Sequence, residues 1–467
     1  MFAQTRAPLL FNPAEFLPHE LMLGILSFLD VPMLLKASEV SRTWHTMCMD
    51  NQLWQKHYVT EYLHTGDHRT TSPTLHERSP QRISFCNWYK SCKQRSHLIQ
   101  NWLYGDFVNF QLPGPRHPDE GHSDAVYAIE ICGDYLVSGS MDRTIRVWNL
   151  STRRLASQPL LGHESGVLSL QFDPKEGRDI IISGGESGEL IVWRFSSKAR
   201  LRSVQHSHSS AVVSLKLNLG LLVTGSKDGL IKVWDVQALC AGEQTEGGAP
   251  MRILHGHRGS VNGVDSFGDT IVSASGDRTV KLWSISQGAC VRTIEESRSL
   301  ACIKLDGTSV LYGGRHGSVA IYSDRLKRSQ ARLHGHKKLV RGVQSRLGCK
   351  SLGVVASASH DGNVILWTRS RKGIWQSRVL NNGTPSIRKT FSSPPAPHTC
   401  APRGARDRSL SKSIPTSAPR EDDNIMSNTA SMFGVDLNHR YLVSCSESSI
   451  ISGWDFAVGD VDIIERF

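Results

Sequence analysis

The chain has 467 residues, of which 39% are hydrophobic and 21% charged, and 54 Lys+Arg against 43 Asp+Glu give a formal net charge of +11. This apolar content is ordinary for a soluble protein, and the length allows a large buried core. The sequence contains no run of about 18 apolar residues and no long apolar N-terminal stretch before small residues. We therefore expect neither a transmembrane helix nor a signal peptide.

The ten cysteines are scattered along the chain, and none forms a Cys-x-x-Cys pair. This pattern predicts no zinc site, and we expect no other metal and no cofactor. Without a secretory signal, the cysteines are expected to be reduced thiols, which favours a cytoplasmic and/or nuclear location.

Residues 1–15 are predicted to form a flexible tail, and residues 16–60 to form three short helices. Pro18 lies where the first turn of a helix tolerates proline. The first helix is expected to end at residues 30–32, where a second begins, and Ser41 can cap a third. Apolar residues of the first helix recur with helical spacing on one face, namely Leu21, Ile25, Phe28 and Leu29. So much apolar surface on so few residues predicts a partner, either another protein or the rest of the chain.

Residues 17–54, LPHELMLGILSFLDVPMLLKASEVSRTWHTMCMDNQLW, resemble an F-box. The Leu-Pro start, the I-L-S-F-L-D run, the V-S-R-x-W segment and the final L-W match that family in order. The resemblance implies binding to the Skp-type adaptor that links substrate receptors to a cullin–RING ubiquitin ligase. By motif match, the adaptor-binding residues would be Leu17, Pro18, Leu21, Ile25, Leu29, Leu34, Leu35, Val40 and Trp44.

Residues 61–105 are interpreted as a loop followed by a helical linker. Residues 64–82 are polar and contain Pro and Ser, whereas residues 83–105 have a helical pattern. The W-Y-K…N-W-x-x-G pattern resembles the helical linker between the F-box and the propeller in F-box/WD-repeat proteins. We expect Trp88, Tyr89 and Trp102 to be packing residues rather than a ligand cage.

A hairpin pattern then recurs, first as LVSGSMDRTIRVWNL at residues 136–150. The four clearest copies have an apolar strand, a tight turn with Asp, and an alternating strand that ends in Trp. The closing aromatic residues are Trp148, Trp193, Trp234, Trp283, Tyr322, Trp367 and Trp454. Most spacings fit the four-stranded WD-repeat blade of about 40–45 residues. The sequence therefore predicts an all-β, seven-bladed propeller, with blades 1–6 in residues 106–369 and blade 7 with its closure in residues 429–467.

Four blades also carry a His, a Ser or Thr, an Asp and a Trp at matching positions. In WD-repeat proteins such a set forms hydrogen bonds inside the blade, and the repetition argues against four catalytic triads. The sets are His122/Ser138/Asp142/Trp148, His208/Thr224/Asp228/Trp234, His257/Ser273/Asp277/Trp283 and His336/Ser357/Asp361/Trp367.

Three blades depart from this pattern, and the closure of the ring has two candidate strands. The Asp position holds Ser187 in blade 2, His316 in blade 5 and Ser448 in blade 7. Either residues 107–112 or residues 461–467 could supply the outermost strand of blade 7. Both alternatives join the two ends of the propeller and remove an open sheet edge.

Residues 370–428 are predicted to be a disordered, basic, Pro/Ser-rich insertion between blades 6 and 7. Residues 368–424 carry 11 Lys+Arg against four Asp+Glu and few large apolar residues. Such a composition does not bury enough surface to order itself. A solvated loop, a phosphorylated regulatory segment and a basic patch for nucleic acid or nuclear import all remain open.

Substrate binding is expected on the propeller face where the loops meet around the channel. In related phosphodegron-binding receptors, arginines occupy the residue before the turn Asp and the fifth residue after the blade's His. By motif match, the substrate-binding residues here are Lys227, Arg315, Arg341 and His360. An arginine can pair with phosphate through two hydrogen bonds, so a phosphorylated or acidic motif is one candidate ligand. Glu186 and Glu447 interrupt the set, and a mixed polar rim without phosphate preference is the alternative.

The resemblance predicts the substrate-recognition subunit of an SCF-type E3 ubiquitin ligase, with no catalytic site of its own. Its expected partners are a Skp-type adaptor, through it a cullin and a RING protein, and a protein substrate. A membrane partner is not expected, and nucleic acid is not favoured. The alternative is a WD-repeat scaffold or nucleic-acid-associated interaction protein that acts without ubiquitin transfer, which the basic insertion favours slightly. The sequence contains no Gly-rich phosphate loop, metal cluster or isolated triad that would favour an enzyme.

Overall fold

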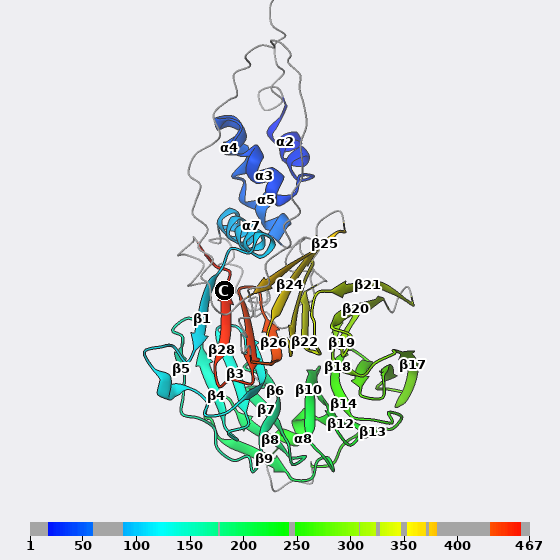
Figure 1. The fold of residues 1–467 in the computed structure, drawn as a ribbon. Coiled ribbons are helices and arrows are strands. Elements are labelled where there is room, and N and C mark those ends of the chain that lie inside the picture. Colours follow the sequence, from blue (N-terminus) through cyan, green and yellow to red (C-terminus); the bar gives the residue numbers. More distant parts are fainter. Residues whose placement is uncertain are drawn as a thin grey trace, which may run out of the picture.

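The structure is a computed structural model that describes residues 17–58, 87–175, 178–241, 248–307, 309–323, 327–346, 353–369, 373–380 and 430–458. The predicted flexible tail, the predicted polar loop at 64–82 and the predicted C-terminal alternative for closure at 461–467 lie outside these residues. Figure 1 shows a small helical domain at one end, the helix α7 beneath it, and a large β-propeller.

The helical domain begins with α2 (His19–Leu26), α3 (Val31–Ala37), α4 (Arg42–Cys48) and α5 (Asn51–Tyr58). Asp30 accepts the N–H of Met33 at 2.9 Å, and Ser41 accepts the N–H of Trp44 at 3.3 Å, so both predicted starts are capped. The predicted third helix is divided into α4 and α5. The division falls at Asp50, whose carboxylate accepts the N–H of Gln52 at 2.8 Å and starts a new helix.

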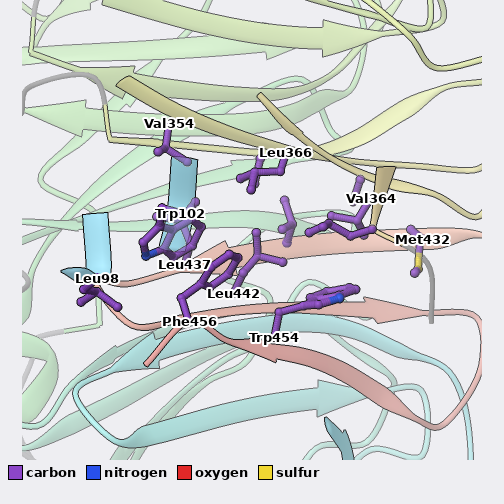
Figure 2. Close-up of a cluster of buried hydrophobic side chains, with 14 residues drawn as sticks. Leu98, Trp102, Val354, Val364, Leu366, Met432, Leu437, Leu442, Trp454 and Phe456 are labelled. Atoms are coloured by element: carbon purple, nitrogen blue, oxygen red, sulfur yellow. The ribbon is translucent and has the colours of Figure 1, made fainter. Parts of the chain in front are cut away.

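Helix α7 (Trp88–Tyr104) belongs to the cores of both domains. Its N-terminal part contributes Trp88 and Cys92 to the helical core, together with the fully buried Trp54. Its C-terminal part contributes Leu98 and Trp102 to a core shared with blades 6 and 7 (Figure 2). A helix buried at both ends in this way fixes the helical domain on the propeller.

The propeller consists of seven four-stranded antiparallel sheets, which we number as blades 1–7 in chain order. The innermost strands are β2 (Val126–Cys132), β6 (Val167–Asp173), β10 (Val212–Asn218), β14 (Val261–Phe267), β18 (Leu300–Asp306), β22 (Val340–Arg346) and β26 (Met432–Leu437). The second strands are β3 (Tyr135–Ser140), β7 (Ile180–Gly185), β11 (Leu221–Ser226), β15 (Thr270–Ser275), β19 (Ser309–Gly314), β23 (Gly353–Ser359) and β27 (Tyr441–Ser446). The third strands are β4 (Ile145–Asn149), β8 (Leu190–Arg194), β12 (Ile231–Asp235), β16 (Thr279–Ser284), β20 (Ser318–Ser323), β24 (Val364–Arg369) and β28 (Ile451–Asp455). The outer strands are β5 (Arg154–Leu155), β9 (Arg200–Val204), β13 (Arg252–Leu254), β17 (Ala289–Glu295), β21 (Arg328–His334), β25 (Trp375–Leu380) and β1 (Val108–Leu112). The short helices η2 (Pro118–Glu120) and α8 (Val236–Cys240) lie in connections.

The ring is closed by the segment that follows α7. Strand β1 pairs antiparallel with β28, from Val108 opposite Asp455 to Leu112 opposite Ile451. Each innermost strand contacts the innermost strands of both neighbouring blades, and β26 of blade 7 contacts β2 of blade 1. Of the two candidates that the sequence left open, residues 107–112 therefore supply the fourth strand of blade 7. The predicted seven-bladed propeller is confirmed.

One predicted boundary is wrong. Strand β25 lies inside the range that composition assigned to the disordered insertion, yet it pairs along β24 from Trp375 opposite Arg369 to Leu380 opposite Val364. Its last residue, Leu380, is 1% exposed and packs in the core shared with α7. Residues 370–372 and 381–428 of that range lie outside the described residues.

Candidate functional site

The helical domain carries an exposed apolar patch, which we call the helical patch. Leu21, Ile25 and Val40 are 58%, 49% and 66% exposed. All three are among the residues that the motif match predicts to bind the adaptor. Phe28, at 91%, and Met33, at 55%, also belong to the patch, although the motif match did not assign them. A patch of this kind on so small a domain is typical of a protein-binding surface.

The other predicted adaptor-binding residues are less accessible. Leu34 is fully buried in the helical core, so its assignment as a contact residue is wrong in this structure. Leu29, Leu35 and Trp44 are partly buried against the same core. Leu17 is half-buried and Pro18 is exposed, both just before α2. An apolar periodicity identifies a helix face, but the neighbouring helices decide whether that face points inward.

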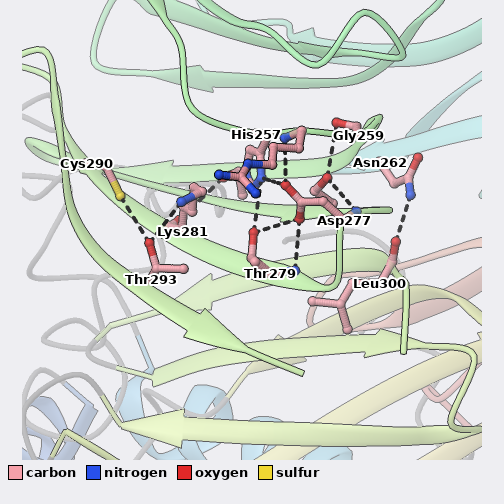
Figure 3. A network of polar contacts seen from close by, with 12 residues as sticks. His257, Gly259, Asn262, Asp277, Thr279, Lys281, Cys290, Thr293 and Leu300 are labelled. Carbon is pink, nitrogen blue, oxygen red and sulfur yellow. Dashed lines mark hydrogen bonds and ion pairs between the residues drawn. The ribbon is translucent and has the colours of Figure 1, made fainter. Parts of the chain in front are cut away.

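Inside the propeller, the four predicted His sets form as expected. In blade 4, His257 lies 2.8 Å from Asp277 through Nδ1 (Figure 3). Its Nε2 lies 2.7 Å from Ser273 Oγ, to which Trp283 donates its Nε1–H at 2.9 Å. The corresponding bonds in blades 1, 3 and 6 measure 2.7–3.2 Å. Each set joins the turn, the loop and the second and third strands of its blade.

These sets are scaffold, because the hydroxyl that a hydrolase would need is inaccessible. Ser138, Thr224, Ser273 and Ser357 are all 0% exposed. Burial lowers the pKa of each set's histidine and so favours its neutral form. Burial alone would raise the pKa of Asp277, but hydrogen bonds from Thr279, Arg258 and His257 lower it to about 2.

Blade 2 uses a carboxylate that the sequence analysis missed. Its Asp position holds Ser187, but Glu189, two residues later, lies 2.7 Å from His163 Nδ1. Ser183 completes the set, since its Oγ lies 2.6 Å from His163 Nε2 and accepts the Nε1–H of Trp193 at 2.9 Å. The longer glutamate side chain reaches the place that aspartate occupies in other blades. A Glu four residues before the closing Trp was the available signal.

Blade 5 replaces the set by a different polar cluster. Glu296 accepts hydrogen bonds from the Tyr312 hydroxyl at 2.9 Å and from Arg332 at 2.6 Å. His316, at the Asp position, lies 3.7 Å from the same carboxylate. Burial, and then the negative charge of Glu296, raises the pKa of Tyr312 above its usual value.

One face of the propeller, which we call the turn face, gathers the turns between second and third strands. In all seven blades the first residue of that turn donates its N–H to the loop entering the innermost strand, at 2.9–3.1 Å. These donors are Met141, Glu186, Lys227, Gly276, Arg315, His360 and Glu447. Helix α7 lies at the opposite face, where Trp102 contacts the β26–β27 turn. The turn face therefore points away from the helical domain.

The structure separates the predicted substrate-binding residues into two groups. Lys227 and Arg315 are exposed on the turns of blades 3 and 5. Arg341 and His360, both of blade 6, are half-buried and adjacent, so that burial and then the charge of Arg341 lower the pKa of His360. Arg341 donates to the Ala301 carbonyl of blade 5 at 3.1 Å. The four do not converge on one point.

Within the described part of the chain, no group of three or more His, Cys, Asp or Glu side chains is placed to hold a metal ion. Every helix that the structure describes is too short or too polar to cross a membrane.

Family comparisons match both domains. The family described as "F-box-like" matches residues 14–60. The family described as "WD domain, G-beta repeat" matches residues 115–149, 155–194, 199–235, 248–284 and 327–368. The unmatched blades 5 and 7 are two of those in which the sequence analysis found departures. The chain thus joins an F-box-like domain to a WD-repeat propeller, and by this arrangement it belongs with the F-box/WD-repeat proteins.

Similar curated proteins are WD proteins of several kinds. The chain is 24% identical over 237 residues to "Transcriptional corepressor LEUNIG_HOMOLOG" of Arabidopsis thaliana, covering 50% of this chain and 28% of that protein. It is 24% identical over 333 residues to "WD repeat-containing protein pop1" of Schizosaccharomyces pombe, covering 59% of this chain and 40% of that protein. The chain spans less than half the length of both relatives. The crystal structure of the "WD40 beta propeller domain of Doa1" matches with a TM-score of 0.53 at 16% identity over 72% of this chain and 94% of that chain, which shows the fold alone.

Proposed function

We propose that this chain is a substrate-recognition subunit of an SCF-type ubiquitin ligase. The helical patch would bind the Skp-type adaptor, and through it a cullin and a RING protein. The propeller would hold the target on its turn face. The observation that carries this proposal is the helical patch itself, an unpartnered apolar surface on an F-box-like domain that α7 fixes to a propeller.

The mechanism is proximity. Ubiquitin transfer would belong to the recruited conjugating enzyme, and this chain would raise the effective concentration of target lysines near it. A rigid connection serves this role because it keeps the target in a fixed region of space. Trp102 provides such a connection, since its ring stacks on Phe456 at 3.7 Å and its Nε1–H donates to the His439 carbonyl at 2.9 Å. The neighbouring Asn101 donates to the Phe456 carbonyl at 2.7 Å.

The test is the affinity of the purified chain for a Skp-type adaptor, measured by calorimetry. The variant Leu21→Asp/Ile25→Asp should lose at least roughly 100-fold in affinity, because each buried aliphatic side chain contributes about 2 kcal/mol. Both side chains are half or more exposed, so the variant should unfold at the wild-type urea concentration. Leu161→Asp, at a 72% exposed site on the propeller, is the matched control and should bind normally. Wild-type adaptor affinity in the double variant would refute the proposal and favour a scaffold that acts without ubiquitin transfer.

A further inference from the structure

The seven innermost strands share a β-bulge that the sequence does not reveal. In each blade, the second residue of the innermost strand has no partner on the neighbouring strand. In blade 1, for example, Val126 pairs with Ser140 and Ala128 with Gly139, so Tyr127 is skipped. The skipped residues are Tyr127, Leu168, Val213, Asn262, Ala301, Arg341 and Phe433. A bulge frees a residue from the ladder and re-aims its side chain. Because every bulge lies where a turn-face loop enters its innermost strand, the seven residues form a ring at the mouth of the channel.

One side of this ring is aromatic. Tyr127 of blade 1 stacks on Phe433 of blade 7, with ring centroids 4.3 Å apart and an interplanar angle of 12°. His360 of blade 6 meets Phe433 edge to face, with centroids 5.7 Å apart. All three side chains are partly exposed. Together they form a partly exposed aromatic cluster that a ligand side chain entering the channel mouth could contact.

Arg341 lies beside this aromatic surface without a carboxylate partner among the described residues. Its guanidinium donates a hydrogen bond to the neutral Ala301 carbonyl. Its buried neighbours are the thiols of Cys302 and Cys445, whose pKa values burial raises to about 12, so both are neutral. Burial also lowers the pKa of Arg341 itself. An acceptor group from a ligand would supply the anionic partner that this guanidinium lacks.

The charge of the turn face is divided between two groups of blades. Exposed cations crowd the turn-face loops of blades 3–6, and we call this set the cationic arc: Lys227, Arg258, Arg278, Arg298, Arg315, Lys337 and Lys338. None of the seven forms an ion pair within the described part of the chain. The exposed carboxylates of the turn-face loops lie on blades 1, 2 and 7, namely Asp124, Glu164, Glu186 and Glu447, although Arg143 is also exposed on the turn of blade 1. Next to the arc, Glu295 is exposed at the end of β17, opposite Thr279 of blade 4. The buried aspartates of blades 3, 4 and 6 reduce the positive charge of the arc but leave it in excess.

We propose that the turn face binds an unphosphorylated acidic segment of a target protein that also carries a large aromatic or apolar side chain. The carboxylates would lie over the cationic arc, one of them would meet Arg341, and the apolar side chain would pack against the exposed parts of the Tyr127/Phe433 pair. Single cations distributed along the loops of four blades suit a run of singly charged carboxylates. The acidic loops of blades 1, 2 and 7 would repel the glutamates of a segment bound in the opposite orientation. This inference rests on the proposed function and adds the substrate class.

The probe is a fluorescently labelled peptide with a run of glutamates followed by a phenylalanine, and its binding to the full chain is measured by anisotropy. Wild-type protein should bind it, and more weakly as salt is raised. The variant Arg298→Glu/Arg315→Glu should weaken binding by about tenfold or more, as expected for reversing two exposed charges. Arg328→Glu, on the outer strand β21 of the same blade, should leave binding unchanged. A peptide with alanine in place of phenylalanine should bind more weakly, and Phe433→Ala should remove that difference.

Several outcomes would overturn the inference. Binding that requires phosphoserine in place of the glutamates would show a phosphate reader instead. Binding of a labelled single-stranded RNA, with no binding of the peptide, would identify a nucleic-acid surface. Equal binding by the arc variant and wild type would show that the arc takes no part. The adaptor measurement is independent of all these variants, so loss of adaptor binding with intact peptide binding would reject only the ligase role.

Discussion

Trp102 should be the residue on which the attachment of the helical domain depends most. Its side chain is 3% exposed, its ring lies on Phe456, and its N–H satisfies the His439 carbonyl. Replacing a buried tryptophan by alanine costs about 3–5 kcal/mol through lost contacts and the cavity left behind. Trp102→Phe keeps a stacked ring and loses the hydrogen bond, so it should cost only about 1 kcal/mol.

The assay is amide hydrogen exchange of α7, because it reports local release of the helix even if the two domains do not unfold together. Trp102→Ala should accelerate exchange in the C-terminal half of α7 by roughly 100-fold or more, since each 1.4 kcal/mol corresponds to a factor of ten. Tyr104→Ala, at a 58% exposed position of the same helix, is the control and should have little effect. Exchange in Trp102→Ala no faster than in Trp102→Phe would refute the described packing.

Two further predictions concern the propeller. Burial lowers the pKa of His257 and its three counterparts, so the unfolded chain binds more protons just below the ordinary histidine pKa of 6.5. The free energy of unfolding should therefore fall as the pH drops below about 6.5, by at most about 1.4 kcal/mol per pH unit for each histidine. In urea titrations, His257→Gln should reduce the slope of the unfolding free energy against pH by the contribution of one histidine, at most about 1.4 kcal/mol per pH unit. A wild-type profile that is flat between pH 7 and 5, about the range in which these groups should act, would contradict the neutral-histidine sets. Leu219 is 74% exposed at φ 47° before Gly220 at φ 88°, a turn that favours Asn-Gly. Leu219→Asn should raise the free energy of unfolding by about 0.5–1 kcal/mol, and Leu219→Val should lower it. Calorimetry measures both values, and a Val variant more stable than the Asn variant would contradict the described turn.

The repeating part of the fold was predictable because its signals are local. The spacing from Ser138 to Asp142 and on to Trp148 lies within one hairpin, so the sequence alone identifies the blade and its internal hydrogen bonds. Glu189 could not be predicted from this spacing, because its longer side chain reaches His163 from a position two residues further along the chain. The local signals also failed to indicate strand β25, whose alternation is weak and which adjoins the basic, Pro/Ser-rich stretch.

The surfaces were predicted less completely, because exposure depends on contacts between elements distant in sequence. Leu34 and Phe28 both fit an apolar helix pattern, yet the other helices bury Leu34 and leave Phe28 exposed. The fifth residue after a blade histidine, the position from which Arg341 was predicted, coincides with five of the seven channel-mouth residues, although the count itself indicates no bulge. Ala301 and Phe433 follow no such histidine, and only the strand pairing places them in the ring.

The central claim is that the helical patch and the propeller act together to bring bound targets to a ubiquitin ligase. The most direct measurement compares cells that express wild-type protein with cells that express Leu21→Asp/Ile25→Asp, in which both the propeller and its turn face are intact. Proteins captured by both forms should accumulate and lose ubiquitin in the variant cells, as read by quantitative proteomics of abundance and ubiquitin-modified peptides. Captured proteins whose abundance and ubiquitination are the same in both cells would contradict the account.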